Sequence, residues 1–287
     1  MTSSEQHIGH VSDTAIWVAY YRAKETERAD ALFRDPLAKI LVGERGKKIA
    51  DDMNTVGRYT EWAVISRTVI IDDFIRSLIL DGIDTVINLG AGLDTRPYRM
   101  DLPSNLLWIE VDHPEIITLK DKLLKLEVPR CQLKRLAIDL ANGEKRKQFL
   151  LQIGSQSKKA LVLTEGVVPY LSENEVTQLA NDLHAQMGLT YWITEFFSPE
   201  IYRYLKGSLT SKKMKNAPLQ FFPSNWMEFF AKTGWIPQEI HHSGEVAQKY
   251  GRSFPMPWWA RILNIFASQA SREKAGKMTG YILFKKV

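Results

Sequence analysis

Apolar residues recur at helical spacing in the first 80 residues of the chain. One helix is predicted to begin at a cap formed by Ser12 or Asp13 and to bury one side of the run TAIWVAYY. A second is predicted over residues 60–80, where apolar side chains repeat every three or four positions. The dipeptide Asp81-Gly82 follows it as a C-terminal stop. We therefore expect a helical N-terminal extension over residues 1–80.

From residue 85 onward, short apolar runs of strand length alternate with longer amphipathic stretches. The strand candidates are the runs TVINLG, LLWIEVD, QLKRLAIDL, ALVLTEG and LTYWITEFF. The helices predicted between them span Pro114–Leu126, Gly143–Ile153 and Glu173–Met187, the last opened by a capping box in SENE. Each crossover between parallel strands needs such a helix, so the alternation indicates an α/β fold with a mostly parallel sheet.

The alternation ends after residue 197. Residues 198–223 are expected to be an insertion or cap near the substrate, and a helix is predicted over Asn225–Thr233. The runs WIPQEIH and TGYILFKKV are strand candidates that can close the sheet with an antiparallel hairpin. We thus expect a single domain over residues 1–287, with a core over 85–197 that residues 224–287 complete.

Composition narrows the class of protein. Hydrophobic residues make up 45% of the 287, and the formal charge is +5, but the basic residues mostly stand beside acidic ones. This pattern is typical of a solvated surface and argues against a nucleic-acid partner. Cys131 is the single cysteine, which excludes an internal disulfide and a cysteine-based zinc site, and we interpret it as a core residue. With no secretory signal or membrane-length apolar run, a cytoplasmic protein without a bound metal or a membrane partner is expected.

The run VINLGAGLDT is the strongest chemical signal in the chain. It places Gly90 and Gly92 directly after the first predicted strand, where ligands of open α/β sheets bind. Glycines there let a nucleoside approach the bare backbone. Alone, the motif is also compatible with a plain strand-to-helix turn, which is the less favoured interpretation.

Acidic residues close the next three predicted strands. Glu110 and Asp112 end the second, and either can accept hydrogen bonds from ribose hydroxyls, because strand alternation puts both on one side. Asp139 with Leu140 ends the third, suited to adenine, although a helix N-cap is an equally good interpretation of Asp139. Glu165 ends the apolar fourth strand.

The motifs NLGAGLDTRPYR, EVDHP, AIDL and TEGVVPYL together resemble the leucine carboxyl methyltransferase family. The resemblance is to its bacterial branch of tetracenomycin-type polyketide O-methyltransferases, and it extends over most of residues 12–195 through TAIWVAYYRAKETERADALFRDPLA and ISRTVIID. It implies a Rossmann-like class I methyltransferase sheet with an antiparallel C-terminal strand. It also implies S-adenosyl-L-methionine as methyl donor and S-adenosyl-L-homocysteine as product.

The resemblance also implies a role for each motif residue. Gly90 is the cofactor-loop glycine, Asp112 the ribose acid, Asp139 and Leu140 the adenine contacts, and Glu165 the acid near the methionine portion. Arg67, in the helix before the first strand, is implied to bind the methionine carboxylate, a role that suits a guanidinium. A basic residue of the N-terminal helix is implied to lie near the cofactor, and either Arg22 or Lys24 matches it.

One departure from many methyltransferases lies in the first strand. Asn88 stands where those enzymes have an acid, and Asp94 in the following loop can serve nearby.

The residues that would act on the methyl acceptor are less clear. A carboxylate acceptor needs no base, whereas a phenol benefits from one, and the candidates are His113, Tyr170, His241 and His242. Aromatic residues past the fourth strand can line an acceptor pocket, but they are more often core: Tyr170, Phe196, Phe197, Tyr202, Tyr204, Trp226, Trp258 and Trp259. The sequence predicts no oligomeric state.

The function expected is O-methylation of a carboxylate or hydroxyl on a small, polyketide-like molecule. Methylation of a protein C-terminal carboxylate is the alternative within the same chemistry. An NAD-dependent oxidoreductase is disfavoured because Thr95 occupies the third glycine position of the dinucleotide fingerprint. A non-catalytic nucleotide-binding protein is disfavoured by the full set of motif residues, and a nucleic-acid methyltransferase by the missing signature for an extruded base.

Overall fold

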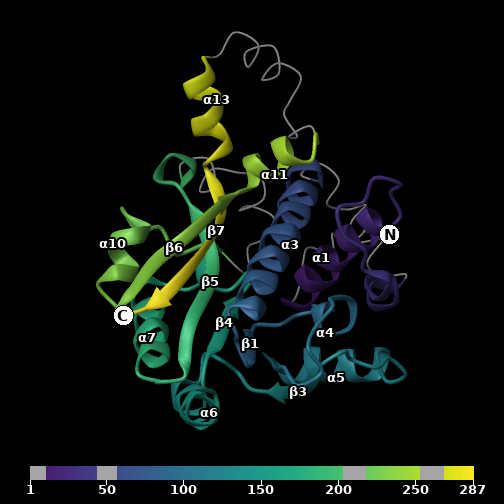
Figure 1. The fold of residues 1–287 in the computed structure, drawn as a ribbon, viewed down its shortest axis with the longest axis vertical. Helices are drawn as coiled ribbons and strands as arrows, with labels where there is room; N and C mark the ends of the chain where they lie inside the picture. The colour runs from purple at the N-terminus through teal and green to yellow at the C-terminus, as the bar shows by residue number, and fades with distance from the viewer. Residues whose placement is uncertain (1–10, 44–56, 203–217, 253–267) are drawn as a thin grey trace, which may run out of the picture.

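A computed structural model of the chain describes residues 11–43, 57–202, 218–252 and 268–287. Its centre is a seven-stranded sheet in the order β3-β2-β1-β4-β5-β7-β6 (Figure 1). Strands β1 to β5 run parallel, and β7 is antiparallel to both β5 and β6. The predicted α/β fold, with a mostly parallel sheet and an antiparallel C-terminal strand, is confirmed.

The strands match the apolar runs of the sequence. They are β1 (Thr85–Leu89), β2 (Leu107–Asp112), β3 (Gln132–Ala137), β4 (Ala160–Thr164), β5 (Leu189–Phe197), β6 (Trp235–His242) and β7 (Thr279–Lys286). Every residue of β1 and β4 is buried, as expected for central strands covered on both faces.

Helices cover both faces of this sheet. They are α1 (Val11–Thr26), α3 (Gly57–Leu80), α4 (Arg96–Arg99), α5 (Pro114–Leu123), α6 (Gly143–Gln156), α7 (Glu173–His184), α10 (Trp226–Ala231), α11 (Ser243–Lys249) and α13 (Gln269–Gly276), with a 3₁₀ turn η2 (Val168–Tyr170). On one face α3 packs over the strands with α11, and on the other α6, α7 and α10 do so (Figure 1). Helix α1 lies beside α3 and adds a smaller cluster of its own.

Several predicted boundaries differ from the structure. Helix α1 already includes Ser12 and Asp13, so neither is its N-cap. Helix α6 continues to Gln156, while α5 ends at Leu123 and α7 at His184, each about one turn earlier than predicted. Hydrophobic periodicity does not mark the ends of α5 and α7, because Leu126 and Met187 are apolar but 90% and 91% exposed. Most of the predicted 198–223 insertion lies outside the described residues.

The strand order reverses between β1 and β4, which are neighbours although β2 and β3 come between them in sequence. The loops that follow β1, β2, β4 and β5 therefore emerge side by side at the carboxyl edge of the sheet. This is the place where open α/β sheets bind their ligands.

Candidate active site

The loop after β1 is built on two glycines in the left-handed region. Gly90 has φ +72° and Gly92 has φ +48°. The amides of Gly90 and Ala91 both donate to the carbonyl of Val111, which folds the loop back over the end of β2. A Cβ on Gly90 would lie 2.5 Å from Val167 Cγ2, so the backbone here packs closer to the β4 loop than any side chain permits.

Asp112 and Glu110, left open as ribose acids by the sequence, have different surroundings. Asp112 lies at the glycine loop, where its carboxylate accepts the amide hydrogens of Gly92 at 2.6 Å and His113 at 2.7 Å. Glu110 is fully buried and paired with Lys120 and Arg135, both at 2.8 Å. The Glu110 side chain has no exposed surface through which it could meet a ligand, so the structure favours Asp112.

Asp139 is exposed just beyond β3 and accepts the amide hydrogen of Ala141 at 2.9 Å. The N-cap of α6 is Asn142, whose side chain accepts from the amide of Lys145. The helix-cap interpretation of Asp139 is therefore wrong, and its carboxylate stands at the carboxyl edge of the sheet. Leu140 follows it, half-buried against the core.

Glu165, directly after β4, lies between two guanidinium groups. Its carboxylate is 2.9 Å from Arg67 Nε on α3 and 2.7 Å from Arg96 Nη1 on α4. Burial alone would raise the pKa of Glu165, but Arg96 and Arg67 outweigh it and hold the pKa below its ordinary value. Arg67 Nε is buried and faces Glu165 Oε1 without an aligned hydrogen bond, so this contact is an ion pair.

Arg96 ties this pair to the glycine loop. It is 2% exposed and also contacts Asp94 at 3.0 Å and Asp72 at 2.7 Å. Asp94 accepts from Asn88 of β1 at 2.9 Å, which joins the first strand to its loop, while Arg99 reinforces Asp72 at 2.6 Å. The sequence analysis assigned no role to Arg96, Arg99 or Asp72. The sequence signals for these residues are the run DTRPYR and the acid that ends the run ISRTVIID. Neither of them specifies the contact.

The two basic candidates on α1 are placed differently. Arg22 is 5% exposed, pairs with Asp35 at 2.9 Å and donates to the carbonyl of Leu93 at 2.5 Å. Lys24 pairs with Glu61 at 2.8 Å, and its side chain is 49% exposed. Arg22 is therefore the one that holds α1 against the glycine loop.

A second buried carboxyl, Glu195, lies one strand further along the same edge. It is 3% exposed at the end of β5 and accepts the amide hydrogen of Gly166, the residue after Glu165. Burial raises the pKa of Glu195 to about 7. Tyr170 and Tyr281 lie close enough for its charge to raise their pKa values, after burial as the larger cause for both. The sequence analysis did not single out Glu195, which is one acid in the run LTYWITEFF.

The histidine candidates stand at the carboxyl ends of β2 and β6, which other strands separate from β5 in the sheet. His113 is exposed at the start of α5. His241 packs on Phe74, and His242 lies against Phe196, with ring centroids 4.5 and 5.7 Å apart.

Four of the eight aromatic residues singled out by the sequence form one packed cluster, namely Phe196, Phe197, Tyr202 and Trp226. The structure thus supports the core interpretation for them. Tyr204, Trp258 and Trp259 lie outside the described residues.

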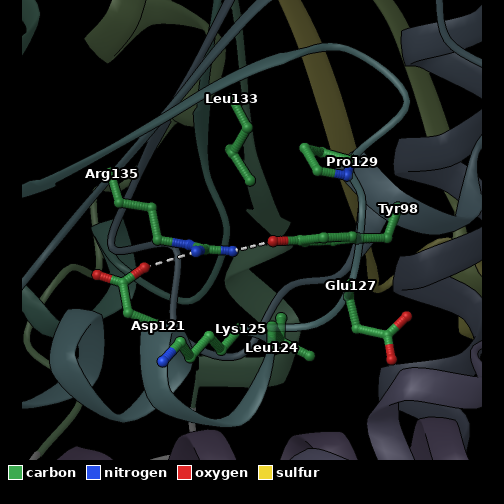
Figure 2. Close-up of a pocket in the computed structure, with 8 residues that line it drawn as sticks. All are labelled: Tyr98, Asp121, Leu124, Lys125, Glu127, Pro129, Leu133 and Arg135. Carbon is green, nitrogen blue, oxygen red and sulfur yellow. Dashed lines mark hydrogen bonds and ion pairs between the residues drawn. The ribbon is translucent and has the colours of Figure 1, made fainter.

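A surface pocket lies elsewhere, between α4, α5 and β3. It is lined by Tyr98, Asp121, Leu124, Lys125, Glu127, Pro129, Leu133 and Arg135 (Figure 2). Arg135 crosses it and donates to Asp121 at 2.6 Å and to Tyr98 at 2.5 Å. Because the guanidinium is already satisfied and no predicted site residue lines the pocket, we interpret it as part of the surface.

In the described part of the chain, His, Cys, Asp and Glu side chains do not gather in threes as a metal ion would need. None of the helices described there has the length and apolar character of a membrane span.

The residues at the carboxyl edge fit S-adenosyl-L-methionine. Gly90 leaves the loop backbone bare, Asp112 offers carboxylate oxygens to ribose hydroxyls, and the Arg67–Glu165 pair matches the carboxylate and ammonium of the methionine portion. Fold and site together define a class I methyltransferase dependent on S-adenosyl-L-methionine.

Comparison with known proteins leads to the same class. Residues 15–184 match the family described as leucine carboxyl methyltransferase, and the chain belongs to this family. A Streptomyces avermitilis protein provisionally named an S-adenosyl-L-methionine-dependent methyltransferase is 31% identical over 276 residues, covering 90% of this chain and 94% of the relative. A Mycobacteroides abscessus protein with the same kind of name is 36% identical over 187 residues, and the match spans 60% of this chain and 61% of that protein.

Among solved structures, a DUF574 family protein from Streptomyces avermitilis covers 94% of this chain and 97% of its own. The two share 12% identity with a TM-score of 0.56, which supports the fold.

Proposed function

We propose that this chain is an O-methyltransferase that transfers a methyl group from S-adenosyl-L-methionine to a carboxylate or hydroxyl of a small molecule. The observation that carries the proposal is the buried Arg67–Glu165 pair beside the glycine loop, which complements the two charges of the methionine portion. Transfer to oxygen is supported by the family, whose description names a carboxyl acceptor.

The residues at the carboxyl edge would divide the binding of the cofactor between them. Asp112 would hold the ribose, Asp139 and Leu140 the adenine, Arg67 the carboxylate and Glu165 the ammonium. When bound, the cofactor supplies a methyl carbon already activated by a positively charged sulfur. The protein then has to align the acceptor and keep water out, which requires few reactive side chains.

A small acceptor is favoured by the burial of the side chains beyond Glu165. Glu195 is 3% and Tyr281 8% exposed, so an acceptor must reach into the protein to meet them. The alternative acceptor, the flexible C-terminal carboxylate of another protein, uses the same chemistry.

Ligand binding separates the classes of function. Thermal unfolding is measured with S-adenosyl-L-homocysteine, NADH and a short DNA duplex in separate samples. We expect S-adenosyl-L-homocysteine alone to raise Tm, since a ligand at 100 times its Kd stabilises the native state by about 2.7 kcal/mol. Stabilisation by NADH alone would contradict a methyltransferase.

The size of the product separates the two acceptors. The protein is incubated with methyl-labelled cofactor and an extract of the source cells, and the products are passed through a membrane that retains proteins. We expect the label in the filtrate. Label retained with protein, and released by carboxypeptidase digestion, would instead indicate a C-terminal carboxylate.

A further inference from the structure

Glu195 is a buried acid to which the proposed cofactor site assigns no contact. Arg67 and Glu165 already match the charges of the methionine portion, and Glu195 lies beyond them at the end of β5. Its carboxyl is held by two hydrogen bonds, from the amide of Gly166 and from the Thr194 hydroxyl, the latter at 3.1 Å. Glu195 therefore lies one strand farther from the glycine loop than Glu165 does.

Strand pairing sets the direction of this side chain. Glu195 is paired with Tyr281 of β7 and follows Tyr191 and Ile193 at two-residue intervals along β5. Tyr191, Ile193 and Tyr281 all belong to the core between the sheet and α3. Glu195 therefore faces α3, the helix that carries Arg67.

The charged and titratable groups around Glu195 come from each neighbouring element. They are Arg67 of α3, Glu165 after β4, Tyr170 of η2 and Tyr281 of β7. Arg67 is the cation of this group, and its charge is shared with Glu165 and with the Tyr281 phenol. Within the described ranges, Glu195 thus has hydrogen bonds but no cation committed to it.

We propose that Glu195 is the catalytic residue that accepts the proton of a phenol-like hydroxyl, which makes this hydroxyl the oxygen that is methylated. This inference rests on the proposed O-methyltransferase function. The acceptor oxygen forms the new bond to the methyl carbon, the carbon–sulfur bond breaks with its electron pair left on sulfur, and the O–H proton passes to the Glu195 carboxylate. The products are a methyl ether, a neutral thioether and a protonated carboxyl, which returns its proton to water.

The same side chain disfavours a carboxylate acceptor. A carboxylate needs no base at neutral pH, and its charge would lie beside the buried carboxylate form of Glu195, where like charges repel. A phenol has a pKa near 10 and gains from a base whose pKa lies near the working pH. Burial raises the pKa of Glu195 to about 7, which meets that requirement.

The neighbouring phenols are poorer bases. Burial raises the pKa of Tyr170 and Tyr281 above their ordinary value near 10, so both keep their protons at neutral pH. The two phenols can donate hydrogen bonds to the acceptor oxygen or to Glu195, but they cannot take the proton of the acceptor hydroxyl.

Alkali treatment tests the type of acceptor without knowledge of its structure. Labelled product from the cell extract is exposed to mild base, which hydrolyses methyl esters to volatile methanol and leaves aryl methyl ethers intact. We expect label that is stable to base. Volatile label would overturn the assignment of a hydroxyl acceptor while leaving the O-methyltransferase function in place, whereas a wild-type protein that fails to bind S-adenosyl-L-homocysteine would defeat the proposed function itself.

The role of Glu195 is tested by Glu195→Gln, which keeps the size and the hydrogen-bond acceptor. We expect unchanged affinity for S-adenosyl-L-homocysteine and at least a 100-fold slower transfer to the extract acceptor at pH 7. The deficit should shrink toward pH 10, where the phenol ionises unaided. Glu195→Asp should restore part of the rate, and Glu200→Gln, at an exposed acid 46% accessible, should behave as wild type. A Glu195→Gln variant with the wild-type rate and pH profile would overturn the proposal.

Infrared spectroscopy gives a readout that needs no acceptor. In the complex with S-adenosyl-L-homocysteine, the difference between wild-type and Glu195→Gln spectra is recorded from pH 5 to 9. We expect a protonated-carboxyl band that disappears with a midpoint near pH 7. A carboxylate band at every pH, or a protonated band at every pH, would show that Glu195 does not exchange a proton near neutrality and would overturn its assignment as the base.

Discussion

Asp112 is the residue on which ribose binding should depend. Asp112→Ala removes the carboxylate that joins the glycine loop to the start of α5, so affinity for S-adenosyl-L-homocysteine should fall by about 1.5–3 kcal/mol, the range for a hydrogen bond to a charged group. Isothermal titration calorimetry measures this loss. Glu110→Gln is the matched control and should leave the affinity unchanged, because Glu110 is committed to Lys120 and Arg135. Unchanged affinity in Asp112→Ala would remove the ribose role from Asp112.

Gly90 is constrained both by its backbone conformation and by the space around it. Gly90→Ala places a Cβ 2.5 Å from Val167 Cγ2 at φ +72°, so it should cost stability through strain and also displace the β4 loop that carries Glu165. Gly82→Ala is a suitable control, since φ is +83° there and nothing lies within 4 Å of the added Cβ. Urea unfolding should show a loss of about 1–2 kcal/mol for Gly82→Ala and a larger loss for Gly90→Ala. Equal losses would mean that close approach at Gly90 has no energetic weight.

Arg96 neutralises three carboxylates within the core. Arg96→Met leaves Asp72, Asp94 and Glu165 short of a cation, and breaking a buried pair in this way costs about 3–5 kcal/mol. Lys39→Met is the control, because the Lys39–Glu27 pair has side chains 78% and 64% exposed, and such pairs contribute about 0–1 kcal/mol. Chemical denaturation of both variants at pH 7 measures the two costs. A similar small loss in both would mean that the carboxylates find other partners.

At the scale of elements, the helix boundaries that carry a local capping signal were predicted better than the α5 and α7 ends that carry none. The capping box of α7 and the Asp81-Gly82 stop of α3 are short-range signals, and both are present: Ser172 and Glu175 cap each other, and Gly82 adopts φ +83°. The ends of α5 and α7 were predicted about a turn too late. The predicted helices end at Leu126 and Met187, which are about nine-tenths exposed, so apolar character there did not mean packing.

The capping box of α7 is also the element whose stability contribution is easiest to isolate. Ser172 accepts the amide hydrogen of Glu175, and the Glu175 carboxylate accepts that of Ser172 at 2.8 Å. Ser172→Ala should lower the free energy of unfolding by about 1 kcal/mol. In Glu175→Gln the amide oxygen can still accept from the Ser172 backbone, so its loss should be smaller. If differential scanning calorimetry shows the reverse order, the cap depends on the charge of Glu175 rather than on the Ser172 hydroxyl.

At the scale of the whole molecule, the sequence predicted where the site lies but not the ion pairs and buried contacts within it. Strand-end acids and the glycine loop are spaced along the chain, so Gly90, Asp112 and Glu165 were predictable as neighbours at one sheet edge. The contacts of Arg96 with Asp72 and Glu165 join three elements far apart in sequence, and the burial of Glu195 depends on β7. Such partners are fixed only when the sheet is assembled, which is why they were not predicted.

The buried carboxyls divide into two groups with opposite effects on stability against pH. Asp72, Asp94 and Glu165 have lowered pKa values because the neighbouring arginines outweigh the effect of burial, so they stabilise the fold above pH 4 to 5 and less as the pH falls. Glu195 has a raised pKa of about 7 against an ordinary value of 4.5. Between these values the folded state holds a proton that the unfolded state has released, so this contribution is lost as the pH rises. Stability should therefore peak near pH 5 to 6.

Glu195→Gln isolates the second effect. The variant cannot ionise at this position, so its stability relative to wild type should increase from pH 5 to pH 8 by up to about 3 kcal/mol, from a difference of about 2.5 pKa units at 1.36 kcal/mol each. Urea unfolding at several pH values measures the change. Glu200→Gln is the control, since the pKa of Glu200 is lowered to about 2 and its charge is constant over this range. Parallel curves for wild type and Glu195→Gln would mean that Glu195 does not titrate there, whereas diverging curves would place a proton-exchanging carboxyl at the end of β5 in the free protein.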